Sequence, residues 1–86
     1  MTVAERIEAK LNEAFAPEAL EVLDESHQHV GHAGWREGGE THFRVRMKAA
    51  SLGDLSRVAR SRAVHKALEE ELAGPVHALA LELSAS

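Results

Sequence analysis

The sequence predicts an α+β fold in which helices pack on one face of a small three-stranded sheet. Three observations support this prediction. Apolar residues recur at helical spacing near the start of the chain, whereas residues 41–48 alternate strictly between apolar and polar side chains. A second alternating apolar run, residues 76–83, follows the helix-ending pair Gly74-Pro75. The expected order is therefore helix, strand, strand, helical region and strand.

The first segment is predicted to be an amphipathic helix that ends near Pro17. Thr2 and Glu5 form a capping-box pattern at its start. The apolar positions that repeat at helical spacing are Val3, Ile7, Leu11, Ala14 and Phe15. Residues 20–24 are then expected to form a short strand.

Residues 25–41 are expected to form a long loop, mobile over about 26–40. They are polar and rich in glycine, and they contain His27, His29 and His32. Loops of this length inside a compact domain are usually functional or mobile.

The second half of the chain contains two predicted strands around a helical region. In residues 41–48, Phe43, Val45 and Met47 share one face, and this strand should pair antiparallel with residues 20–24. Residues 55–72 are predicted to be helical, with a kink or a split near 60–62, where Arg62 interrupts the apolar stripe. That stripe consists of Leu55, Val58, Val64, Leu68 and Leu72. In the last strand, Leu79, Leu81 and Leu83 should face the helices.

Composition limits the class of protein. A chain of 86 residues is too short for two hydrophobic cores, so we expect one domain spanning residues 1–86. No apolar run approaches the ~20 residues of a membrane span, and the first residues lack the pattern of a secretory signal. We therefore expect a cytoplasmic protein with no membrane partner.

Histidine is the residue type most suggestive of chemistry, because the chain has six histidines and no cysteine. His77 opens the last predicted strand. It is either a structural histidine bonded to a backbone carbonyl or a metal ligand held on a rigid strand. The loop histidines are either solvated or its partners. His42 and His65 are interpreted as structural or solvated.

A metal site built from these histidines alone is incomplete. A structural zinc site needs about four protein ligands. A [2Fe–2S] cluster also needs four ligands, usually thiolates, although two histidines can replace two of them on one iron. Because the chain has no cysteine, a partner or a small thiol would have to supply the sulfur. The sequence thus predicts a cluster site shared at an interface, with a plain histidine site for zinc as another possibility.

A basic helical face supports a different interpretation. Its residues are Arg57, Arg60, Arg62 and Lys66. They could lie over DNA phosphates as in a helix-turn-helix, or they could form a solvated face, since Glu69, Glu70 and Glu71 follow. The net charge of −4 argues weakly against non-specific binding of nucleic acid. No arrangement of catalytic residues stands out, so we do not expect an enzyme.

Five short motifs together resemble the BolA family. They are Asp24-Glu25-Ser26, Gly-Glu-Thr-His-Phe at 39–43, Arg60-x-Arg62, Glu70-Glu71-Leu72 and Val76-His77-Ala78-Leu79. The match runs from the first helix to residue 83. The resemblance implies an α-β-β-α-α-β arrangement of the class II KH type, in agreement with the order above. Two departures are Arg60-Ser61-Arg62 where the family has Arg-His-Arg, and Leu52-Gly53-Asp54 where it has Phe-x-Gly.

The resemblance also implies a partner and a cofactor. BolA-like proteins pair with monothiol glutaredoxins and share a [2Fe–2S] cluster whose thiolates come from the glutaredoxin and glutathione. His77 matches the family's C-terminal histidine ligand, and either His29 or His32 matches the ligand from the loop. The implied role is iron–sulfur cluster assembly and trafficking or iron regulation. We expect the free chain to be a monomer that binds no cofactor alone. The alternative function is a DNA-binding transcriptional regulator that uses Arg57–Lys66.

Overall fold

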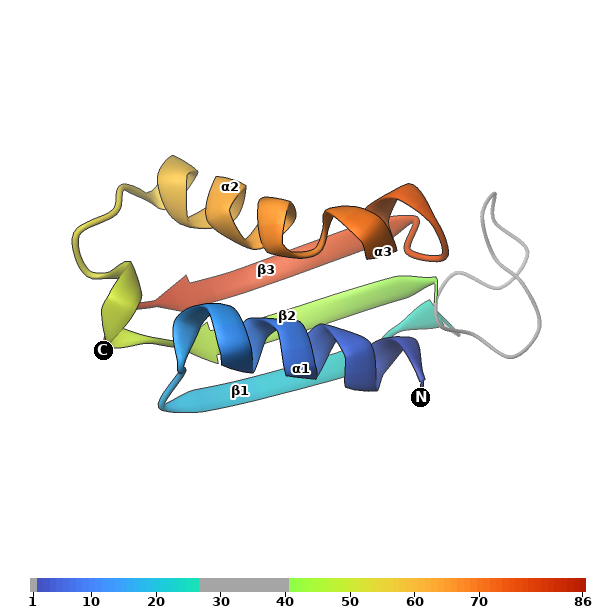
Figure 1. Ribbon diagram of the computed structural model, residues 1–86, viewed down its shortest axis with the longest axis horizontal. Helices are drawn as coiled ribbons and strands as arrows, with labels where there is room; N and C mark the ends of the chain where they lie inside the picture. The colour runs from blue at the N-terminus through green and yellow to red at the C-terminus, as the bar shows by residue number, and fades with distance from the viewer. Residues whose placement is uncertain (1, 27–40) are drawn as a thin grey trace.

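The computed structural model describes residues 2–26 and 41–86, and its elements follow the predicted order (Figure 1). The helices are α1 (Val3–Phe15), α2 (Arg57–Ala67) and α3 (Glu69–Ala73), with a short 3-10 turn, η2 (Ala50–Leu52). The strands are β1 (Ala19–Asp24), β2 (His42–Lys48) and β3 (Ala78–Ser84). The predicted α+β class is confirmed.

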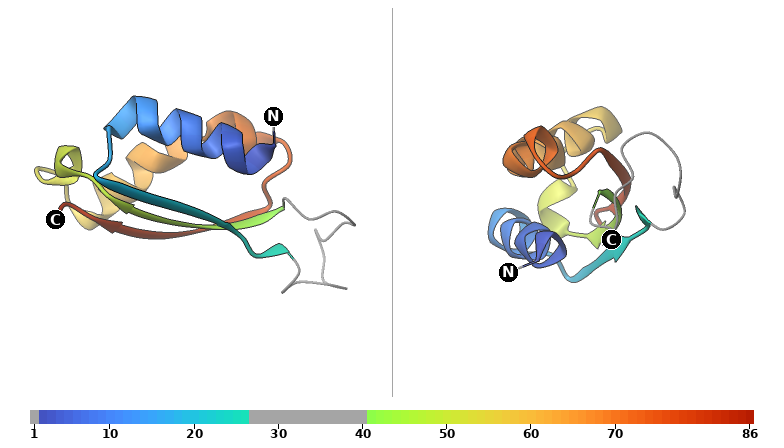
Figure 2. Two further views of the ribbon diagram at one scale, coloured as in Figure 1. Left: turned by 90° about the horizontal axis from the view of Figure 1, so that it is seen from below. Right: turned by 90° about the vertical axis from the view of Figure 1, so that its right-hand side faces the viewer.

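The sheet has the order β1-β2-β3, with β2 in the centre. β1 pairs antiparallel with β2, which confirms the predicted hairpin pairing, and β3 pairs parallel with β2. A parallel neighbour requires a crossover connection, and here α2 and α3 provide it. All three helices lie on the same face of the sheet (Figure 2).

The core lies between that face and the helices. Phe43, Val45 and Met47 of β2 are buried, as their alternation predicts. Leu79, Leu81 and Leu83 of β3, which were predicted to face the helices, are partly buried against the same core. The other buried core residues include Ile7, Leu11, Val64 and Leu68.

The ends of α1 follow from local chemistry. The Thr2 hydroxyl accepts the Glu5 amide, and the Glu5 carboxylate accepts the Thr2 amide, which confirms the capping box. The helix ends at Ala16, whose φ of 47° lies in the left-handed region. Pro17 cannot extend the helix, so the chain turns toward β1.

The predicted break in the helical region is wrong in position. The helix breaks at Leu68 (φ −106°, ψ 18°), one turn beyond Val64, and not near residues 60–62. This break allows both Leu68 and Glu71 to be buried. Arg62 causes no kink because it lies on the exposed side of α2. The predicted stripe is also too long, since Leu55 and Val58 are 36% and 59% exposed.

The last strand starts two residues later than predicted, at Ala78. His77 therefore precedes β3, and its side chain is exposed. No helix within residues 2–26 and 41–86 has the length and apolar character to span a membrane.

Candidate functional site

His77 is an exposed imidazole on a fixed backbone. Its amide donates to the Thr41 carbonyl at 2.7 Å, which attaches it to the start of β2. Within the described residues, no group hydrogen-bonds to its ring nitrogens. The His77 ring stacks beside that of His42, with ring centroids 6.4 Å apart and an interplanar angle of 28°. His77 thus has free ring nitrogens for a ligand.

His42, by contrast, is a buried structural residue. It is 8% exposed, and its Nδ1 is 2.8 Å from the Thr41 hydroxyl. Its backbone amide donates to the Ser26 hydroxyl. The sequence left open whether His42 is a structural or a solvated residue, and these contacts agree with the structural interpretation. The pairing of His42 with His77 was not predicted, because it depends on the parallel register that places His42 opposite Ala78.

Ser26 joins the two strands that flank residues 27–40. Its buried hydroxyl donates to Asp24 at 2.5 Å and accepts the amides of Thr41 at 2.8 Å and His42 at 3.1 Å. The Ser26 amide also donates to Asp24, as in an Asx turn. Both attachment points of the segment are therefore fixed beside the backbone of His77. The Asp-x-Ser spacing is the sequence signal from which this turn could have been predicted.

An ion-pair network links the strands on the face of the sheet that the helices leave open. Arg44 on β2 bonds Glu25 at 3.0 Å and Glu82 on β3 at 2.9 Å. The hydrogen bond to Glu25, followed by that to Glu82, raises the pKa of Arg44 above its ordinary value. Hydrogen bonds from Arg44 and then Arg46 lower the pKa of Glu82. Three strands are thereby linked across the face that the helices leave open.

The predicted loop ligands His29 and His32 lie outside the described residues, as does His27. The structure therefore does not test their approach to His77. Within residues 2–26 and 41–86, no group of three or more histidine or carboxylate side chains is arranged to hold a metal ion. Among the described residues, His77 contributes one exposed imidazole at this end of the sheet.

The four basic residues of the candidate DNA face have different roles. Arg60 directs its Nε to the carbonyls of Leu52 and Leu55, at 3.0 and 3.1 Å, and so holds the turn before α2. Arg57, Arg62 and Lys66 are exposed and form no ion pair with any described residue. Three of the four are therefore available to a ligand through their whole head group.

Comparison with known proteins identifies the family. The profile of the family described as BolA-like protein matches residues 11–86. The chain belongs to the BolA-like family. It is 50% identical over 76 residues to BolA-like protein 1 of Mus musculus, covering 88% of this chain and 53% of the mouse protein. The chain thus spans about half the length of that relative.

Two further matches are a bacterial BolA protein and a solved BolA domain. The chain is 43% identical over 81 residues to the DNA-binding transcriptional regulator BolA of Escherichia coli, covering 94% of this chain and 73% of that protein. Its fold matches the BolA domain of SufE1 from Arabidopsis thaliana with a TM-score of 0.83 and 35% identity, covering 95% and 91% of the two chains. These matches confirm the predicted family and its arrangement of helices and sheet.

Proposed function

We propose that this BolA-like protein is a non-enzymatic partner of a cytoplasmic monothiol glutaredoxin, with which it shares a [2Fe–2S] cluster. The glutaredoxin and glutathione would supply thiolates, and this chain would supply histidine. The role would be iron–sulfur cluster assembly and trafficking or iron regulation. The observation that carries the proposal is the exposed His77 ring, which no described residue engages through a hydrogen bond.

The backbone around His77 suits a ligand that must be held in place. Its amide is bonded to Thr41, and the neighbouring Ala78 begins the ladder with β2. A ligand on a strand end is positioned more precisely than one on a free loop. The chain has no cysteine, so the remaining ligands must include thiolates from elsewhere if a [2Fe–2S] cluster is bound.

The anchoring of Ser26 and Thr41 supports a second ligand from the segment between them. His29 follows Ser26 by three positions and His32 by six. Extended chains of these lengths reach at most about 11 Å and 22 Å, respectively. Because Ser26 bonds the residue that bonds His77, both histidines remain candidates for the second ligand.

The test is anaerobic cluster reconstitution with a monothiol glutaredoxin and glutathione, followed by size exclusion with visible absorbance. We expect a coloured 1:1 heterodimer that His77→Ala loses or alters spectrally. The matched control is His65→Ala, which removes an exposed histidine of α2 whose Nδ1 lies 2.7 Å from the Ser61 carbonyl. Equal cluster content with an unchanged spectrum in the His77 variant would contradict the proposal.

The loop ligand is resolved by the same assay on His29→Ala, His32→Ala and the double variant. The ligand is the histidine whose loss reproduces the spectral change of His77→Ala. If the double variant keeps the wild-type spectrum, this chain contributes no ligand from the segment.

A second candidate function is DNA binding by α2. It is favoured by Arg57, Arg62 and Lys66, which form no ion pair with any residue that the structure describes, and by the described role of the E. coli relative. The logarithm of the affinity should fall by about 0.9 per phosphate contact for each tenfold rise in salt. Replacing Arg62 and Lys66 by alanine should reduce that slope by nearly two units. A slope that the substitutions leave unchanged, or no binding at low salt, would contradict this function.

A further inference from the structure

In the part of the chain that the structure describes, the outer edge of β3 is an unpaired sheet edge. The ladder to β2 runs from the Ala78 amide on Thr41 to the Ser84 carbonyl, which accepts the amide of Ala49. In a parallel pair, alternate residues direct both backbone groups to one neighbour. The even-numbered residues therefore face β2, and Leu79, Leu81 and Leu83 direct their N–H and C=O groups away from the sheet. No described residue bonds these groups.

This edge lacks the features that usually block strand addition. Edge strands are commonly protected by proline, by bulges or by charged side chains, especially lysine. The sequence of β3, Ala-Leu-Ala-Leu-Glu-Leu-Ser, contains one charged residue and no proline. That residue, Glu82, is already paired with Arg44 and Arg46 on β2.

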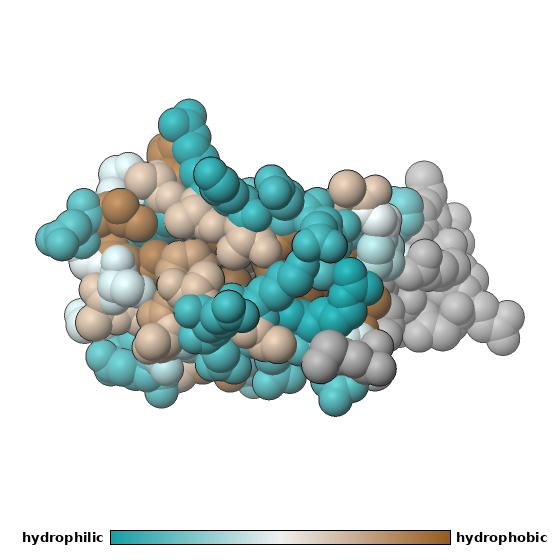
Figure 3. Space-filling model, viewed as in Figure 1, coloured by the Kyte–Doolittle hydropathy of each residue, from teal (hydrophilic) through white to brown (hydrophobic). Residues whose placement is uncertain are grey.

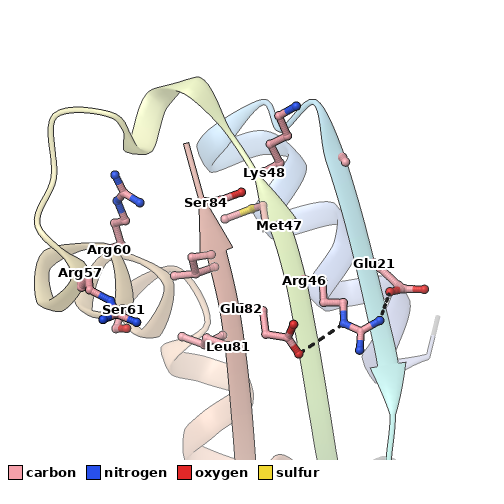
Figure 4. Close-up of a pocket in the computed structure, with 12 residues that line it drawn as sticks. Glu21, Arg46, Met47, Lys48, Arg57, Arg60, Ser61, Leu81, Glu82 and Ser84 are labelled. Carbon is pink, nitrogen blue, oxygen red and sulfur yellow. Dashed lines mark hydrogen bonds and ion pairs between the residues drawn. The ribbon is translucent and has the colours of Figure 1, made fainter. Parts of the chain in front are cut away.

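A cavity of about 700 Å³ lies between this edge and α2 and extends over the open face of the sheet (Figure 4). Figure 4 shows α2 with Arg57 and Ser61 on one side of β3, and Arg46 and Glu21 on the other. The residues that β3 contributes are Leu81, Glu82, Leu83 and Ser84. The open edge and the cavity thus form one surface.

The unneutralised charge around the cavity is positive. Arg57 has no ion-pair partner among the described residues. Arg60 is bonded to carbonyls through its Nε, and none of the described carboxylates pairs with it. On the open face, Arg46 is balanced by Glu21 and Glu82. Both carboxylates that line the cavity are therefore paired, whereas Arg57 and Arg60 lack an acidic partner among the described residues.

We propose that the outer edge of β3 binds an extended, acidic segment of a partner protein by strand addition. The main chain of that segment pairs with the outward N–H and C=O groups of Leu79, Leu81 and Leu83. Alternate side chains of an added strand lie on the helix-covered side. Acidic residues at those positions would contact Arg57 and Arg60. This site is separate from His77 and does not depend on the proposed cluster.

The charges argue against two other occupants. The β3 edge of a second copy would bring no unpaired acidic residue to Arg57 and Arg60, because the one charged residue of β3, Glu82, is already paired with Arg44 and Arg46. A single-stranded nucleic acid would satisfy the charge, but such sites usually stack bases on aromatic side chains. No aromatic residue lines the cavity.

The test uses the full chain and a fluorescein-labelled, amidated octapeptide that alternates threonine and glutamate. Anisotropy measures the Kd, and ¹H–¹⁵N spectra locate the contact. We expect binding that shifts and protects the amides of Leu79, Leu81 and Leu83 more than those of the even-numbered residues. The same peptide with its alternate amides N-methylated, or with lysine in place of glutamate, should not bind.

Two pairs of variants identify the determinants. Arg57→Glu should raise the Kd about tenfold by replacing attraction with repulsion. Its control, Arg62→Glu, makes the same charge change on the same helix, outside the cavity lining, and should change the Kd about twofold or less.

Leu81→Pro removes an outward amide without removing a bond to β2 and should also raise the Kd about tenfold. Leu81→Ala controls for the loss of packing, and circular dichroism checks that each variant folds.

Four outcomes would overturn the proposal. One is the absence of peptide binding, and another is equal weakening by Arg57→Glu and Arg62→Glu, which would indicate a diffuse charge effect. A third is a shift of the ¹H–¹⁵N signals of the β3 amides by an oligothymidine but not by the peptide, which would assign the edge to nucleic acid. The fourth is a concentration-dependent dimer that protects the same amides without peptide, which would assign it to a second copy.

Discussion

The Ser26 side chain connects the end of β1 to the start of β2, at the His77 end of the sheet. Its hydroxyl satisfies two backbone amides of the β2 region and is itself bonded to Asp24 on β1. The hydroxyl is buried, so water cannot replace it cheaply. One oxygen thus fixes the strand ends that lie beside His77.

Replacing Ser26 by alanine should therefore destabilise the protein by about 2–3 kcal/mol, because two buried amides lose their acceptor. Chemical denaturation measures the change. Amide exchange should also accelerate at Thr41 and His42 more than at the far end of β2. Ser51→Ala is a control, because the Ser51 hydroxyl makes one exposed bond to Phe15. Equal effects of the two substitutions would refute this role for Ser26.

At the scale of elements, α3 is attached to α1 by a buried carboxylate. Glu71 has no exposed surface, and it bonds Arg6 at 2.8 Å and Lys10 at 2.9 Å. Glu70 contacts Lys10 from the surface. In Figure 3, hydrophilic surface extends across the side of α1 that faces α3. The break at Leu68 makes this connection possible, because it turns Glu71 inward after α2 has ended.

This carboxylate makes stability depend on pH in a defined direction. Burial would raise the pKa of Glu71, but hydrogen bonds from Lys10, its own backbone and Arg6 outweigh burial, so the pKa lies below the ordinary 4.5. A carboxyl with a lowered pKa stabilises the fold above its unfolded pKa, and the contribution is lost as pH falls through the folded pKa. The Glu71 contribution is therefore present at neutral pH and declines below about pH 4.5.

We expect Glu71→Gln to lower the free energy of unfolding by about 2–4 kcal/mol at pH 7. This value is smaller than that of a fully buried ion pair, because Arg6 and Lys10 are partly exposed. The deficit should shrink as the pH is lowered from 5 toward 3, where the wild-type carboxylate gains a proton. Urea unfolding across this range measures both. Glu70→Gln is the control, since the Glu70 side chain is 77% exposed. A deficit that is independent of pH would show that Glu71 acts by shape alone.

At the scale of the whole molecule, the central position of β2 organises both candidate surfaces. The parallel register puts the starts of β2 and β3 at the same end, beside the attachment points of residues 27–40. It also leaves β3 at the edge, with α2 above it (Figure 1). The candidate cluster ligand therefore lies at one end of β3, and the cavity lies at the other.

Hydrogen exchange in the free protein should reflect this arrangement. The amides of β2 that bond β1 or β3 should exchange only through global unfolding, because this strand is covered on both sides. The outward amides of Leu79, Leu81 and Leu83 should exchange faster than those of Ala80, Glu82 and Ser84 by more than about tenfold. Uniform protection along β3 would mean that its outer edge is covered in the free protein.

The sequence determined the elements and the faces they bury, because these follow from local periodicity and capping. The Thr2–Glu5 cap and the alternation of Phe43, Val45 and Met47 were predicted correctly for this reason. The predicted role of His77 as a ligand also stays a prediction, and its position before β3 was not predicted. The expected ligands His29 and His32 stay predictions, since they lie outside the described residues.

Only the tertiary structure decided what depends on contacts between distant segments. These are the stacking of His42 on His77, the break at Leu68 that buries Glu71, and the open edge of β3. Each depends on strand register or on a partner tens of residues away. Periodicity records which face of an element is buried, but the identity of the covering residue is a property of the assembled fold.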